Sequence, residues 1–256
     1  MKLREALQKY PTLLETGPLG TRLYYDYQYT QGPHMAVMDE RGRAFLERIY
    51  RADIDVAKAY VLPIIVNAAT FRASENHLKT HDMDSLEHVH QVNKACIGLV
   101  KDICDSYTKP TAPLIVGAPL GSMVDAYQVD TSLTIAQAKA YHSQQMAMFK
   151  ELDVDFVNAL TLSTITEARG IAEAASDFNL DYTIGFILNE SGTLLDGTPV
   201  EQAIATMDNN QLNVMQPLGY LITCTHASVI TKLSIKEPFM HHRLLGVQAN
   251  GSNLPY

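Results

Sequence analysis

The sequence has little cysteine: three residues in 256, at positions 96, 104 and 224. Three widely spaced cysteines exclude the disulfide framework of a small secreted protein, so we expect a reducing, cytoplasmic setting. Cys96 and Cys104 fall in a predicted helix and are separated by about 12 Å of helical rise. That separation is too long for the two thiols to share a metal ion, which favours core packing for both.

Long apolar runs and clusters of basic side chains are also missing. Val61–Val66 is far shorter than the ~20 residues of a membrane span, and it contains Pro63. The first ten residues resemble a short amphipathic helix and lack the apolar core of a signal peptide. The 20 Lys and Arg residues are scattered and the net charge is -8. Since nucleic-acid binding depends on clustered positive charge, neither a nucleic acid nor a membrane is expected as a partner.

Short apolar segments alternate with segments of helical spacing along the whole chain. Strands that are apolar throughout are typical of parallel sheets buried on both faces. The predicted strands are 13–17, 61–66, 114–117, 155–160, 181–188, the strand ending at 224, and 243–249. The predicted helices are 43–60, 85–107, 134–152, 166–178, 199–207 and 227–233, with a tyrosine-rich loop at 24–29.

Right-handed crossovers on such a pattern give either a closed barrel or a doubly wound open sheet. No Gly-x-Gly-x-x-Gly follows the first strand, which weighs against a dinucleotide-binding sheet. The length of 256 residues suits one α/β barrel. We therefore predict an α/β fold, an incomplete (β/α)8 TIM-type barrel formed by residues 1–256 as a single domain. With an eighth strand and helix missing, unpaired edges on the first and seventh strands predict a homodimer.

Cys224 ends a short apolar strand, and a helix begins within a few residues of it. A thiolate at the exposed end of a buried strand can bind a soft metal or attack an electrophile. A free cysteine is equally common as a small core residue. His226, two residues later, could point the same way as Cys224 and chelate, although a histidine at a solvent-exposed helix start is the more frequent arrangement.

Six blocks stand at strand ends and turns along the chain: Leu13–Leu23 at the first strand and turn, Asn67–Ser74, Gly117–Gly121, Gly192–Val200, Thr223-Cys224 and Ala249-Asn250. In their order and spacing these blocks resemble the homocysteine S-methyltransferases, whose domain is a zinc-dependent (β/α)8 barrel. The resemblance extends to Ser252, and no single block decides it.

The resemblance implies methyl transfer to the thiol of homocysteine, which gives methionine. In that family three cysteine thiolates hold zinc at the C-terminal mouth of the barrel, and Cys224 matches one of them. Zinc keeps the substrate thiol as a thiolate at neutral pH. The thiolate then attacks a methyl group on a sulfonium, ammonium, folate or corrinoid donor. Zinc, a small thiol and a methyl donor are thus the expected cofactor and partners.

Three departures from the family pattern stand against this activity. The Gly-Gly-Cys-Cys pair that supplies the other two zinc ligands is absent. Leu160-Thr161 replaces a Glu-Thr whose glutamate contacts the substrate amino group, and Thr223 replaces asparagine. One thiolate cannot hold a catalytic zinc. The alternatives are a truncated or degenerate homologue that binds small molecules or assembles without catalysis, and an unrelated metal-free barrel enzyme such as a lyase using Glu15.

The candidate site residues besides Cys224 also lie near strand ends. Glu15, at the end of the first strand, is the candidate catalytic residue, because barrel enzymes place reactive groups there. A buried, hydrogen-bonded structural carboxylate is the competing interpretation. Thr161 and Asn250 are the candidate substrate contacts.

A second group of possible metal ligands consists of histidines. His81, His88 and His90 occur among acidic residues, which could indicate a metal site. A solvated helix start with capping acids is the interpretation that we favour.

Overall fold

The computed structural model describes residues 1–108, 110–209, 214–233 and 240–252. The chain divides into two compact units. Unit 1 comprises Met1–Pro119 and Met148–Val157, and unit 2 comprises Leu120–Ala147 and Asn158–Tyr256. The assignment of residues 1–256 to one domain stays a prediction.

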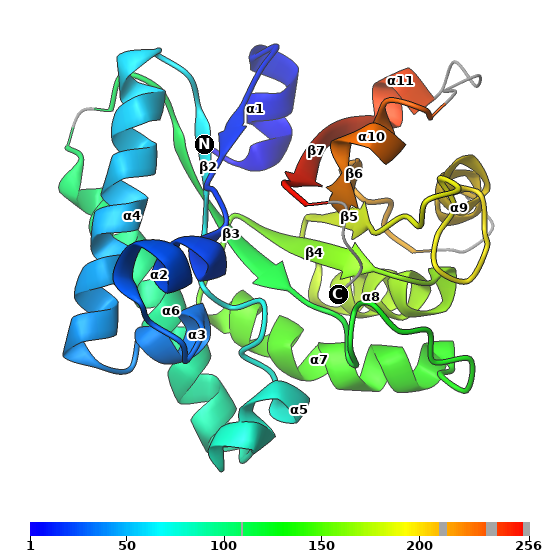
Figure 1. Ribbon diagram of the computed structural model, residues 1–256, viewed down its shortest axis with the longest axis horizontal. Helices are drawn as coiled ribbons and strands as arrows, with labels where there is room; N and C mark the ends of the chain where they lie inside the picture. The colour runs from blue at the N-terminus through cyan, green and yellow to red at the C-terminus, as the bar shows by residue number, and fades with distance from the viewer. Residues whose placement is uncertain (109, 210–213, 234–239, 253–256) are drawn as a thin grey trace. The chain divides into compact units, whose positions relative to one another are not determined.

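Unit 1 contains the first three strands of the chain and the helices between them (Figure 1). Its elements are α1 (Leu3–Lys9), β1 (Leu14–Glu15), α2 (Leu19–Tyr27), α3 (Pro33–Ala36), α4 (Glu40–Ala59), β2 (Ile64–Asn67), α5 (Glu75–Leu78), the 3-10 helix η1 (Lys79–His81), α6 (Leu86–Ser106) and β3 (Leu114–Leu120).

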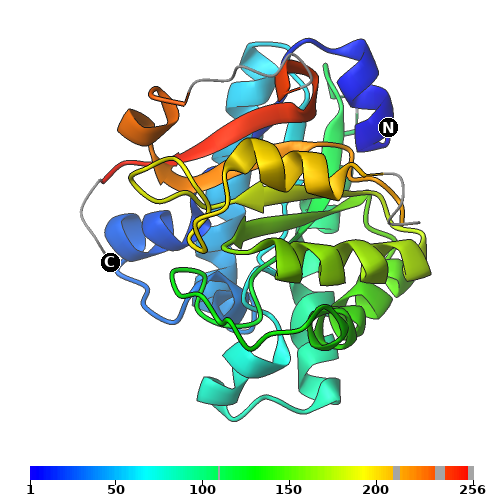
Figure 2. The ribbon, with the colours of Figure 1, turned by 90° about the vertical axis from the view of Figure 1, so that its right-hand side faces the viewer.

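Unit 2 continues the alternation, and its strands β5, β6 and β7 lie side by side (Figure 2). Its elements are α7 (Ile135–Glu151, as far as Ala147), β4 (Phe156–Leu162, from Asn158), α8 (Ile165–Phe178), β5 (Tyr182–Phe186), α9 (Val200–Met207), β6 (Tyr220–His226), α10 (Ala227–Ile230), α11 (Met240–Arg243) and β7 (Leu244–Asn250).

The seven strands follow one another in sequence order, from β1 to β7. The pairs β1–β2 and β2–β3 in unit 1 and the pairs β5–β6 and β6–β7 in unit 2 are parallel. Strand and helix alternate along the chain, the pattern that favours a parallel sheet. The predicted α/β class with seven strands is therefore confirmed, and the described residues contain no eighth strand.

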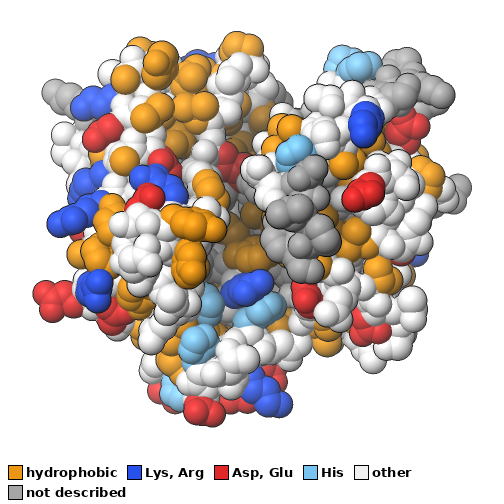
Figure 3. Space-filling view, viewed as in Figure 1, with side chains coloured by type: hydrophobic (Ala, Val, Ile, Leu, Met, Phe, Trp, Pro, Cys, Tyr) orange, Lys and Arg blue, Asp and Glu red, His pale blue; other side chains and the backbone are white. Residues whose placement is uncertain are grey.

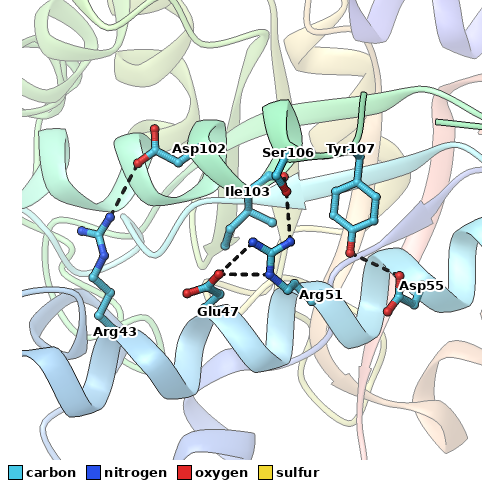
Figure 4. A network of polar contacts seen from close by, with 8 residues as sticks. All are labelled: Arg43, Glu47, Arg51, Asp55, Asp102, Ile103, Ser106 and Tyr107. Atoms are coloured by element: carbon cyan, nitrogen blue, oxygen red, sulfur yellow. Dashed lines mark hydrogen bonds and ion pairs between the residues drawn. The ribbon is translucent and has the colours of Figure 1, made fainter. Parts of the chain in front are cut away.

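Helices α4 and α6 pack against each other in unit 1. Their apolar positions are buried, for example Ile49 of α4 and Val100 of α6, both 0% exposed. A polar network joins their outer sides: Arg51 donates to Glu47 at 2.8 Å and to Ser106 at 3.0 Å (Figure 4). Exposed polar contacts of this kind contribute only about 0–1 kcal/mol each to the free energy of unfolding. The buried apolar faces of α4 and α6 therefore hold the two helices together.

In unit 2, α7 and α8 approach closely at a glycine. A Cβ on Gly170 would lie 2.5 Å from the Cβ of Ala138, so only glycine allows this separation. The predicted start of α7 is confirmed, because Thr134 and Gln137 form a reciprocal capping box (2.7–3.3 Å). No helix within the described ranges is long and apolar enough to cross a membrane.

The predicted loop at residues 24–29 is wrong for most of its length, because α2 continues to Tyr27. Tertiary contacts explain the helix: Leu23 is fully buried, and the ring of Tyr27 stacks on Phe45 with centroids 4.3 Å apart. Gln28 then ends α2 in the left-handed conformation. Tyr24 and Tyr25 are 51% and 71% exposed, so neither belongs to the core.

Candidate functional site

Cys224 lies in β6, at an irregularity in the pairing with β7. The register shifts between Thr223 and Thr225, so that Cys224 has no partner in the ladder. Its φ is 51°, in the left-handed region that residues with a Cβ rarely adopt. Such bulges change the direction of a side chain and are common beside active sites. The thiol is half-buried.

Thr161 in β4 shares this unusual backbone, with φ at 61°. A β-branched residue in the left-handed region is a genuine outlier and costs of order 1–3 kcal/mol. Its Oγ1 lies 3.1 Å from Sγ of Cys224. Two candidate residues from different strands are thus in direct contact, in a conformation that the surrounding structure must maintain.

Thr223 provides part of that support. Its side chain is fully buried, and its Oγ1 accepts a 3.0 Å hydrogen bond from the backbone N–H of Thr161. Gly185 of β5 leaves room for it, since a Cβ there would lie 2.6 Å from Cγ2 of Thr223. Our sequence interpretation missed Gly185, although an isolated glycine inside a strand is a signal of close approach by a neighbour.

Asn250, at the end of β7, also contacts Cys224. Its Nδ2 donates to the backbone carbonyl of Cys224 at 3.0 Å. The structure therefore brings Thr161, Cys224 and Asn250 together in unit 2, and we call these three residues with Thr223 the Cys224 cluster. Their roles in substrate or metal binding stay predictions.

His226 does not join Cys224 as a chelating partner in this structure. Its Nδ1 accepts a hydrogen bond from the N–H of Ser228 at 3.2 Å and so caps α10. Capping by the ring nitrogen satisfies one of the free N–H groups at a helix start. The helix-start interpretation of His226 agrees with this contact.

Glu15 lies at the end of β1 in unit 1 and belongs to a separate group of polar side chains. Its carboxylate accepts a hydrogen bond from Nδ2 of Asn67, at the end of β2. The backbone N–H of Asn67 donates to Thr16 Oγ1 at 3.1 Å, and its carbonyl accepts from the hydroxyl of Tyr50 at 2.9 Å. Gly117 of β3 is required here, because a Cβ would clash with Oδ1 of Asn67.

The Oδ1 atom of Asn67 is buried and has no hydrogen-bond partner among the described residues. Together with the carboxylate of Glu15 it presents oxygen acceptors at the carboxyl ends of β1 and β2. Oxygen acceptors of this kind suit a ligand ammonium group. The structure thus places Glu15 in a hydrogen-bonded strand-end site and leaves its catalytic role a prediction.

The described residues do not fit a zinc site of the three-thiolate type. No group of three or more His, Cys, Asp or Glu among them could hold a metal ion. Cys96 is fully buried, which raises the pKa of its thiol, and burial raises the pKa of Cys104 to about 12. Neither thiol is a thiolate at neutral pH, the form that binds zinc. Among the described residues, the polar contact of the Cys224 sulfur is with Oγ1 of Thr161, and Asn250 contacts the backbone carbonyl of Cys224.

Comparisons with known proteins agree with this fold. A sequence model described as homocysteine S-methyltransferase matches residues 17–254. The metallated form of the homocysteine methyltransferase MmuM from Escherichia coli matches with a TM-score of 0.77 and 18% identity, covering 96% of this chain and 94% of that one. The oxidized form has a TM-score of 0.74, 16% identity and the same coverage. No curated protein matches.

The family match covers most of the chain, and the structural match confirms the predicted barrel-type α/β fold. The family match excludes the alternative of an unrelated barrel enzyme. The chain belongs to the homocysteine S-methyltransferase family.

Proposed function

We propose that this protein transfers a methyl group from a small donor to the thiol of homocysteine, giving methionine in the cytoplasm. The family match over residues 17–254 is the observation that carries the proposal. The Cys224 cluster supports it, because a half-buried thiol is held there at a strand end in a strained backbone. Strain of this kind persists where the surrounding structure over-determines it, and it concentrates at functional sites.

The chemistry of the proposed step is a displacement at carbon. The homocysteine thiol loses its proton to solvent, and the sulfur forms a new bond to the methyl carbon. The bond between that carbon and the donor heteroatom breaks, and its electron pair leaves with the donor. In family members zinc supplies the acidity that makes the thiolate available at neutral pH.

The residues of this chain are assigned more limited roles. Thr161 Oγ1, 3.1 Å from Sγ of Cys224, orients that sulfur and can donate a hydrogen bond to it as a thiolate. Asn250 fixes the backbone carbonyl of Cys224. In unit 1, Glu15 and Asn67 present oxygen acceptors of the kind that an ammonium group prefers, and Glu15 stays the candidate catalytic residue.

A second candidate function is a homologue that binds a small thiol or donor without catalysis. The specific observation in its favour is that the described residues provide no set of three zinc ligands. Leu160, in place of the glutamate expected next to Thr161, also favours it. A thiol substrate bound without metal activation keeps its ordinary pKa, which leaves little thiolate at neutral pH.

Metal analysis and a methionine assay on the purified full chain separate the two candidates. Methyl transfer predicts methionine formed from homocysteine with a sulfonium, ammonium or folate donor, and stoichiometric zinc would count against the non-catalytic homologue. A chain without zinc that binds homocysteine but forms no methionine with any donor would support the non-catalytic homologue. Under the methyl-transfer proposal, Cys224→Ser should lose methionine formation in the same assay. Cys104→Ser is the matched control, because Cys104 lies in unit 1, outside the Cys224 cluster.

A further inference from the structure

Four cationic or ionisable nitrogen side chains gather in unit 1 on segments that follow β1 and β2. His34 belongs to α3, after β1, and Arg72, His77 and His81 lie between β2 and α6. We call these four residues the His34 cluster. Both segments leave the carboxyl ends of parallel strands, the side on which barrel folds place their ligand sites. Figure 3 shows histidines gathered beside a basic side chain on one face of the molecule.

His34 is the buried member of the cluster. It is only 6% exposed, and its Nε2 has no hydrogen-bond partner among the described residues. The ring meets that of His81 edge-to-face, with centroids 5.7 Å apart. Gly32, at φ 80°, lies against the ring, since a Cβ there would come within 3.2 Å of Cε1. The ring is therefore held in place while one of its nitrogens lacks a partner.

The ionisable groups that act on the pKa of His34 are all bases. Burial, the largest cause, and the charges of His81, His77 and Arg72 together lower the pKa of His34 to about 4. No carboxylate is among the groups that act on this ring. Arg72 is exposed and forms no ion pair within the part of the chain that the structure describes. Buried polar groups usually have partners, so the unpaired ring nitrogen of His34 beside basic side chains requires an explanation.

We propose that the His34 cluster binds a small oxyanion, the carboxylate or phosphate group of a soluble ligand. An oxyanion accepts hydrogen bonds from imidazole N–H groups and is held bidentately by a guanidinium. It would provide the partner that Nε2 of His34 lacks and neutralise the repulsion among the four groups. A cation fits poorly, because no set of three metal-binding side chains exists among the described residues.

Binding of an oxyanion has a defined pH dependence. The bound negative charge raises the pKa of His34 from its depressed value of about 4. Protons are therefore taken up on binding. The affinity therefore increases as the pH falls toward the free-state pKa of His34, about 4, because the bound anion stabilises the protonated ring.

The test is a titration of the full chain with inorganic phosphate in one arm and succinate in the other, followed by calorimetry and by ring ¹⁵N resonances of His34. We expect saturable binding and a shift of the His34 ring. The arm with the tighter binding identifies a phosphate or a carboxylate ligand. No saturation in either arm, or saturation without a shift of His34, would overturn the proposal.

Variants distinguish a built site from general positive charge. Arg72→Gln and His81→Gln should each weaken binding about tenfold, the effect of losing one charge-assisted contact. Lys79→Gln is the matched control, because Lys79 is exposed and lies in η1 beside His81. An equal loss in the Lys79 variant would contradict the proposal. If His81→Gln does not fold, the binding affinity of Arg72→Gln alone tests the proposal. No step uses activity, so the outcome is independent of the proposed methyl transfer.

Discussion

Replacing Glu167 by glutamine should destabilise unit 2 by about 2 kcal/mol. Glu167 is 1% exposed, at the start of α8, and its carboxylate accepts hydrogen bonds from Ser122 Oγ at 2.7 Å and from the N–H of Met123 at 2.5 Å. Nε2 of His142 lies 3.0 Å away. These contacts anchor the loop after β3 to the start of α8.

The magnitude follows from what glutamine retains. Its amide oxygen can still accept from Met123 and His142, but the hydrogen bonds lose their charge. A charge-assisted bond contributes about 1.5–3 kcal/mol and a neutral one about 0.5–1.5, so two bonds lose about 2–3 kcal/mol. Release of the buried charge offsets part of that loss. Glu173→Gln on the same helix, an outward ion-pair residue, should change stability by less than about 0.5 kcal/mol.

The pH dependence gives an independent check. Burial raises the pKa of Glu167, but the hydrogen bond and charge of His142, Met123 N–H and Ser122 together lower it below the ordinary value of 4.5. The stabilisation is therefore fully present above pH 4.5 and is lost as pH falls through the folded-state pKa. Urea unfolding should show a constant gap between wild type and variant near neutrality that narrows in acid. A gap below about 0.5 kcal/mol at neutral pH, or one that does not narrow, would refute this reasoning.

Three further predictions concern the proposed site and assembly. Gly185→Ala should destabilise the protein by about 1–3 kcal/mol, because the new Cβ meets Thr223 at 2.6 Å; an unchanged urea midpoint would contradict the described contact. Thr161→Val removes the hydroxyl that contacts the Cys224 sulfur, so kcat for methionine formation should fall about tenfold while stability changes little. An unchanged kcat would show that Thr161 has no part in the reaction. The β7 edge, with Leu245 and Val247 37% and 51% exposed, should support a homodimer in light scattering; a clean monomer would end that proposal.

The order of strands and helices could be predicted because buried parallel strands are uninterrupted apolar segments. Helix starts with capping side chains were also readable, as at Thr134 and Ser85. The helix α2 was missed because its stability comes from Tyr27 stacking on Phe45, a contact between segments. Helices of four residues, such as α3 and α5, are too short to show a periodic pattern.

The candidate site was predictable in position but not in geometry. The family resemblance located Thr161, Cys224 and Asn250 at strand ends, and the structure brings them together. The left-handed backbone at Thr161 and Cys224 leaves no mark in a sequence, since both residue types usually adopt other conformations. The buried Glu167–His142 pair was likewise missed, because charged residues on helices are mostly exposed.

The most direct test of the central claim is the transfer of an isotopically labelled methyl group to homocysteine by the full chain. We expect labelled methionine from the wild-type protein and from Cys104→Ser, and its loss in Cys224→Ser. Labelled methionine formed equally well without the Cys224 thiol would contradict the role of this strand end. No labelled methionine from the wild-type protein with any donor class would contradict the proposed methyl transfer itself.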